Sequence, residues 1–147
     1  MLHLDENSVL LDIGARNKEG VLRELAELLQ KKCPHIDTET LAGALREREL
    51  IGSTGVGNGV AIPHGKVAGL ETILYCFGRS EEGIPFDAID NQPAHYFFMI
   101  LSPVNAAEEY LKTLAGASRL LKQPDIKRRL RLATTKKEVI DIFAQAR

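Results

Sequence analysis

The segment Gly52-Ser-Thr-Gly-Val-Gly-Asn-Gly59-Val-Ala-Ile-Pro-His-Gly-Lys66 separates two parts of different character in this 147-residue chain. Its first half, residues 52 to 59, holds four glycines in eight residues. Such a density of glycine is typical of a loop whose backbone approaches a ligand or another protein closely. Its second half has the apolar composition of a short strand that leads to His64, between Pro63 and Gly65. The segment therefore predicts a loop that runs into a strand of a sheet.

Helical and strand patterns interleave on both sides of this segment. Apolar residues recur at a spacing of about 3.6 in the expected helices and form short continuous runs in the expected strands. The expected strands are Val9–Ile13, Val60–Lys66, Thr72–Gly78 and His95–Leu101. The expected helices are Lys18–Lys32, a second one capped by Asp37 and ending near Glu49, one between Ser102 and Pro124 with Leu111 on its apolar stripe, Asp125–Leu132, and a last one behind the capping box Thr135–Glu138. Interleaving without strict alternation predicts an α/β fold, a single domain over residues 1–147 with a mixed sheet flanked by helices.

Charge and cysteine content narrow the classes of partner. The formal net charge is -1, so no global field favours nucleic acid or an anionic membrane. No apolar run reaches the ~18 residues of a membrane helix. Cys33 and Cys76 lack the paired spacing of a zinc site, and the N-terminus lacks the features of a signal peptide. We expect a cytoplasmic protein without metal, nucleic acid or membrane insertion.

The glycine-rich loop does not match a nucleotide site. A Walker loop needs Lys and then Ser or Thr after its last glycine, and the dinucleotide fingerprint needs a third glycine where Val60 stands. Peptide N–H groups of the loop can still converge on an anion. We therefore expect phosphate binding by five loop residues, namely Ser53, Thr54, Gly57, Asn58 and Gly59. Neutral imidazole, with an ordinary pKa of about 6.5, is a suitable nucleophile for phosphoryl transfer, and His64 is the candidate.

The run from Arg48 to Lys66 resembles the phosphorylation-site signature of the mannitol/fructose-type (type 2) enzyme IIA domains of the bacterial phosphotransferase system. The run Ile84–Pro93 looks most like the nitrogen-regulatory branch, and the resemblance extends over essentially the whole chain. It implies a mixed sheet of about five strands. It also implies that His64 accepts a phosphoryl group from a histidine-containing phosphocarrier protein and that Arg48 lies near the site to stabilise the phosphate. We expect no cofactor, and a phosphotransferase component rather than an enzyme that turns over a small molecule.

Two branches of that family remain as alternatives. Nitrogen-branch relatives use their phosphorylation state to regulate partner proteins. The lack of a fused IIB domain in this chain favours the hypothesis of such a regulator. Sugar-transporting relatives instead pass the phosphoryl group to a cysteine of a IIB domain. One position departs from the family pattern, because Tyr110 stands where many relatives carry a second histidine.

Two further possibilities rest on the residues alone. A hydrolase using Ser53 and His64 is weakly supported, since no acidic residue is placed by sequence to orient His64 and no nucleophile-elbow motif surrounds Ser53. His95 could approach His64 from a neighbouring strand, although a histidine at the surface end of a strand is the favoured interpretation.

Overall fold

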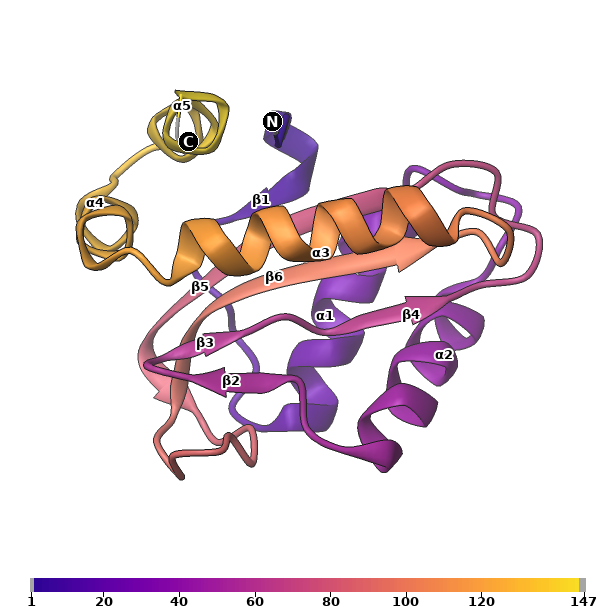
Figure 1. The fold of residues 1–147 in the computed structure, drawn as a ribbon, viewed down its shortest axis with the longest axis horizontal. Coiled ribbons are helices and arrows are strands. Elements are labelled where there is room, and N and C mark those ends of the chain that lie inside the picture. Colours follow the sequence, from indigo (N-terminus) through magenta and orange to yellow (C-terminus); the bar gives the residue numbers. More distant parts are fainter. Residues whose placement is uncertain (1, 146–147) are drawn as a thin grey trace.

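A mixed six-stranded sheet lies between two layers of helices in the computed structural model, which describes residues 2–145 (Figure 1). The strands are β1 (Val9–Leu10), β2 (Gly55–Gly57), β3 (Val60–Ala61), β4 (His64–Lys66), β5 (Leu74–Ile84) and β6 (Ala94–Ser102). The helices are a 3-10 turn at Glu6–Ser8, α1 (Lys18–Gln30), α2 (Thr38–Ile51), α3 (Ala107–Leu121), α4 (Pro124–Leu132) and α5 (Lys136–Gln145). The predicted α/β fold is thus confirmed, with six strands where about five were expected.

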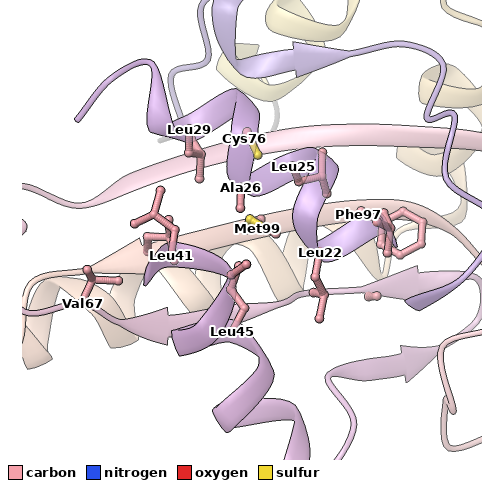
Figure 2. Close-up of a cluster of buried hydrophobic side chains, with 14 of the residues drawn as sticks. Leu22, Leu25, Ala26, Leu29, Leu41, Leu45, Val67, Cys76, Phe97 and Met99 are labelled. Carbon is pink, nitrogen blue, oxygen red and sulfur yellow. The ribbon is translucent and has the colours of Figure 1, made fainter. Parts of the chain in front are cut away.

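Strand β6 lies at the centre of the sheet and contributes side chains to two hydrophobic cores, one on each face. It pairs antiparallel with β5 on one side and parallel with β3 and β4 on the other. Because side chains alternate along a strand, Phe97 and Met99 face α1 and α2, whereas Phe98 and Ile100 face α3, α4 and α5. Figure 2 shows the first of these cores, where leucines of α1 and α2 meet Phe97, Met99 and Cys76 from the sheet.

Helix starts follow the predicted chemistry. The Asp37 side chain accepts a hydrogen bond from the Thr40 backbone N–H, and Thr135 Oγ1 accepts one from Glu138 N. Each bond satisfies a backbone donor that the first turn of a helix leaves free. Among the described residues, no helix combines the length and apolar character that crossing a membrane requires.

Several boundaries differ from the sequence prediction. Strand β5 continues to Ile84 instead of ending at Gly78, through the polar residues 79 to 82, and its register with β6 shifts there. Part of the glycine-rich loop forms β2, which pairs antiparallel with β3. The predicted strand Val60–Lys66 is interrupted at residues 62 and 63, where proline provides no backbone N–H for a ladder. The strand predicted at Val9–Ile13 keeps only Val9 and Leu10.

The apolar stripe of α3 is narrower than predicted. Tyr110, Ala117, Leu120 and Leu121 are buried, but Leu111 is 62% exposed. The prediction that Leu111 packs in the core is therefore wrong, because it lies outside the arc of the helix that faces the sheet.

Candidate functional site

His64 is the first residue of β4, which lies beside β6 between α2 and α3 (Figure 1). Its Nδ1 atom lies 2.7 Å from the Ile62 carbonyl oxygen. A carbonyl only accepts hydrogen bonds, so this contact assigns the hydrogen of the neutral ring to Nδ1. The lone pair of Nε2 is consequently free, and the ring is a nucleophile at that atom.

The surroundings favour the neutral form of this ring. Burial lowers the pKa of His64 below its ordinary value of 6.5, and the positive charge of Arg48 acts in the same direction. The hydrogen bond to Ile62 and the carboxylate of Glu49 oppose this shift without cancelling it. Because desolvation penalises the charged form of a base, His64 is uncharged at neutral pH.

Tyr110, in the first turn of α3, packs against the imidazole. The two ring centres are 5.8 Å apart in an edge-on arrangement. Burial raises the pKa of Tyr110 to about 12, so its hydroxyl stays protonated and carries no charge at neutral pH. The ring also faces Lys66, whose Nζ atom lies 5.9 Å from the ring centre.

The two faces of β4 contact different helices. His64 and Lys66 are two residues apart and both meet Tyr110, on the side of α3. Gly65 points to the other side, where a Cβ atom would lie 3.2 Å from the Ala44 carbonyl oxygen of α2. The lack of a side chain at Gly65 therefore allows β4 and α2 to approach closely.

Arg48 brings positive charge to the site from the last turn of α2. Its Nη1 atom donates to the Gly52 carbonyl oxygen at 2.8 Å, which directs the guanidinium toward the end of the helix. Its charge lowers the pKa of both His64 and Tyr110. These three predicted residues are therefore brought together by α2, β4 and α3.

Ser53 and Thr54 already use their hydroxyl hydrogens within the protein. The Ser53 hydroxyl donates to the Phe86 carbonyl oxygen at 2.6 Å, and the Thr54 hydroxyl donates to the carboxylate of Glu49. Phosphate binding by these hydroxyls would require both bonds to break. The contact with Phe86 also leaves Ser53 without the histidine partner that a serine hydrolase needs.

The turn of Gly57, Asn58 and Gly59 lies at the other end of the sheet. All three residues have positive φ angles, of 91, 55 and 81°, and they reverse the chain between β2 and β3. On β6, Val60 pairs with Tyr96 and His64 with Ile100, an offset of four residues. At about 3.3 Å per residue this offset places the turn roughly 13 Å or more from His64. The structure thus does not support the expected role of these three residues in binding phosphate, because their glycines shape a hairpin instead.

His95 is also distant from the site. It is the second residue of β6, near the turn of Gly57 to Gly59, and its Nδ1 atom lies 2.9 Å from the Ser80 carbonyl oxygen. In the neighbouring turn between β2 and β3, the backbone N–H of Asn58 donates a hydrogen bond to the Asp90 carboxylate at 2.9 Å.

Sequence reasoning missed Glu49 and Lys18. The Glu49 side chain is only 6% exposed, and its Oε1 atom lies 2.8 Å from Lys18 Nζ. Nothing in the local pattern distinguishes Glu49 from the other charged residues of α2, since its burial depends on α1 and on the loop that follows α2.

Fold and site together define a small α/β protein that presents a neutral histidine, with Nε2 free, beside an arginine and a tyrosine. Residues 2–146 match the model of the family described as "Phosphoenolpyruvate-dependent sugar phosphotransferase system, EIIA 2". The chain belongs to this family.

Similar proteins come from two branches. The chain is 39% identical over 137 residues to a fructose-specific EIIA component of Haloferax volcanii (93% of this chain, 89% of that protein) and 34% identical over 133 residues to a nitrogen regulatory protein of Pseudomonas aeruginosa (90% and 86%). It is 35% identical over 142 residues to a fructose-specific EIIABC component of Bacillus subtilis, matching 97% of this chain and only 22% of that protein. The crystal structure of nitrogen regulatory protein IIA-Ntr from Neisseria meningitidis superposes with a TM-score of 0.90 at 32% identity, covering 95% of this chain and 94% of that one.

Proposed function

We propose that this protein is a phosphohistidine carrier of the phosphotransferase system that accepts a phosphoryl group on Nε2 of His64. The observation that carries the proposal is the hydrogen bond from Nδ1 to the Ile62 carbonyl, which leaves Nε2 as the nucleophilic atom of a neutral ring. The donor is a histidine-containing phosphocarrier protein, as the membership of the EIIA 2 family supports.

The transfer balances without movement of a proton. The Nε2 lone pair forms the new bond to phosphorus while the donor's nitrogen–phosphorus bond breaks, and that electron pair returns to the donor ring. Nδ1 keeps its hydrogen, which remains bonded to Ile62. Arg48 stabilises the negative oxygens of the group in transit, and the Tyr110 hydroxyl offers a neutral donor.

Exposed apolar side chains on the neighbouring segments support a protein as the donor. Leu50 and Ile51 directly follow Arg48 and Glu49 in sequence and are 86% and 82% exposed. Val104 precedes α3 and Leu111 follows Tyr110, and both are exposed. Large apolar residues in water next to a reactive group are typical of a surface that docks another protein.

Mass measurement tests this function. The protein is incubated with enzyme I, the phosphocarrier protein and phosphoenolpyruvate, beside the variants His64→Ala and His95→Ala. Wild type and His95→Ala are expected to gain one phosphoryl group that is lost in acid, while His64→Ala gains none. Equal gain by wild type and His64→Ala would overturn the assignment.

For the fate of the phosphoryl group we favour the nitrogen-regulatory role, in which phosphorylation changes binding to regulatory proteins. The structural similarity to IIA-Ntr from Neisseria meningitidis, with a TM-score of 0.90, supports this choice. The alternative is transfer to a IIB cysteine, which the identity to fructose-specific components supports. Incubating the phosphorylated protein with a fructose-type IIB domain distinguishes the two, since only a sugar-transport component loses its phosphoryl group to the cysteine.

A further inference from the structure

The buried carboxylate of Glu49 has no part in the transfer step described above. It receives hydrogen bonds from the Thr54 backbone N–H, at 3.1 and 3.0 Å to its two oxygens, and from the Thr54 hydroxyl. Lys18 of α1 supplies the opposite charge at 2.8 Å, and its Nζ atom also lies 4.8 Å from the centre of the Phe86 ring. Burying a carboxylate is costly unless hydrogen bonds and an opposite charge compensate for the lost water, as Thr54 and Lys18 do for Glu49.

A continuous series of hydrogen bonds leads from this carboxylate to His64. Glu49 holds Thr54 through its N–H and hydroxyl, and the Thr54 carbonyl accepts a bond from Ile62 N at 3.0 Å. The Ile62 carbonyl in turn accepts the Nδ1 hydrogen of His64 at 2.7 Å. Pro63 restricts the backbone between the last two residues. Four elements of the fold, α1, α2, the loop at residue 54 and β4, are joined in this way.

We propose that Glu49 is a positioning residue, which acts through Thr54 and Ile62 to hold the hydrogen of His64 on Nδ1 and so keeps Nε2 free to accept the phosphoryl group. The second half of this statement rests on the proposed function of His64. The first half concerns only the tautomer of the ring and stands independently of it.

Glutamine is the informative replacement at this position. Glu49 accepts from three donors, two on Thr54 and one on Lys18, and it offers no hydrogen of its own. A glutamine has one acceptor oxygen and a donating NH2 group, so it cannot satisfy all three. Thr54 then loses part of its anchor, and the Ile62 carbonyl is no longer held toward His64.

The tautomer is read directly from long-range 1H–15N correlation spectra of 15N-labelled protein at about pH 8, where the ring is neutral. Wild type is expected to show a protonated Nδ1 and an unprotonated Nε2. Glu49→Gln is expected to show a mixture of both tautomers. Glu47→Gln is the matched control, because it removes the same charge from an exposed position of the same helix, and its spectrum should equal that of wild type.

Phosphorylation by the phosphocarrier protein gives a second measurement. The initial rate for Glu49→Gln should fall in proportion to the lost Nδ1–H population, by about two- to tenfold, since only that tautomer has a free Nε2. If Glu49→Gln does not fold, Thr54→Val removes one of the three bonds and should shift the tautomer in the same direction. A wild-type tautomer in the folded variant would overturn the inference. Failure of every protein to gain phosphate would instead overturn the proposed function and leave the spectra to decide on Glu49.

Discussion

The His64 imidazole combines burial with one bonded and one free nitrogen, and this combination determines how its reactivity depends on pH. Because burial and Arg48 hold its pKa below 6.5, the neutral and reactive form is retained further into acid than for an exposed histidine. The initial rate of phosphorylation should therefore be constant from about pH 9 to below pH 6.5 and fall only at lower pH. Rates measured with a saturating donor across this range test the prediction.

The same shift affects stability. Below pH 6.5 the unfolded chain binds a proton at residue 64 more readily than the folded protein does, so the free energy of unfolding should decrease as the pH falls from 6.5 toward the folded pKa. The variant His64→Gln should lose this part of the pH dependence. A phosphorylation rate that begins to fall above the ordinary imidazole pKa of about 6.5, together with an NMR titration of His64 at that higher pH, would contradict both predictions.

We expect Tyr110 to influence how long a phosphoryl group stays on His64. With a pKa raised to about 12, it can donate a hydrogen bond but offers no positive charge, whereas a histidine there can be protonated. Tyr110→His should lengthen the lifetime of phospho-His64, on the order of tenfold if one charge-assisted hydrogen bond is gained. Hydrolysis of the purified phosphoprotein provides the measurement. Tyr110→Phe, which keeps the ring but removes the hydroxyl, should shorten the lifetime, and equal rates for all three proteins would exclude a role for this position.

The contact between strand β4 and helix α2 positions His64 and depends on Gly65. A methyl group there would lie 3.2 Å from the Ala44 carbonyl oxygen, which is held in the backbone of α2 and cannot move independently. Gly65→Ala should therefore lower the free energy of unfolding by about 1–3 kcal/mol and slow phosphorylation of His64. Urea denaturation followed by circular dichroism gives the first quantity.

Gly116→Ala is the control for this substitution. A Cβ atom there meets nothing within 4 Å, and the residue lies inside α3. Alanine should raise stability by about 0.5–1 kcal/mol, since glycine is the poorer helix former. Equal effects at positions 65 and 116 would show that the approach of β4 to α2 is not the limiting contact.

Local patterns predicted those elements whose own side chains decide their structure. The helices from Lys18 and Asp37 appear as expected, because apolar spacing and a capping aspartate act within a few residues. The polar end of β5 and the strand β2 could not be predicted, since both depend on pairing with segments distant in sequence.

In the site, too, the features that depend on segments distant in sequence could not be predicted. His64 was a candidate from its own chemistry, Arg48 and Tyr110 were added by the family resemblance, and the structure brings the three together. The turn Gly57–Gly59 was expected at the phosphate because the peptide N–H groups of a glycine-rich loop can converge on an anion, yet the register of β3 and β4 along β6 places this turn far from His64. Glu49 was missed because its burial arises only when α1 and the loop at Thr54 pack around it.

For the whole molecule, the central strands β5 and β6 belong to both cores. Cys76, Phe97 and Met99 lie in the core shared with α1 and α2, and Phe77 and Phe98 lie in the core shared with α3, α4 and α5. Loss of either core would expose one face of the same pair of strands. We therefore expect both helical layers to unfold in one cooperative transition.

The two cysteines test this cooperativity from different depths. Cys76 is fully buried on β5, which raises the pKa of its thiol to about 12, and burial also raises the pKa of Cys33, in the turn that follows α1. Since the thiolate is the reactive form, neither cysteine should react with a thiol reagent while the protein is folded.

In a Cys33→Ala variant, labelling of Cys76 should proceed only through global unfolding, and its rate should rise with urea as steeply as the unfolding equilibrium constant does. In a Cys76→Ala variant, Cys33 should label faster and with a weaker dependence on urea, because fraying at the end of α1 exposes it. Labelling of Cys76 that is independent of urea would mean that β5 opens locally and that the two layers do not unfold as one unit.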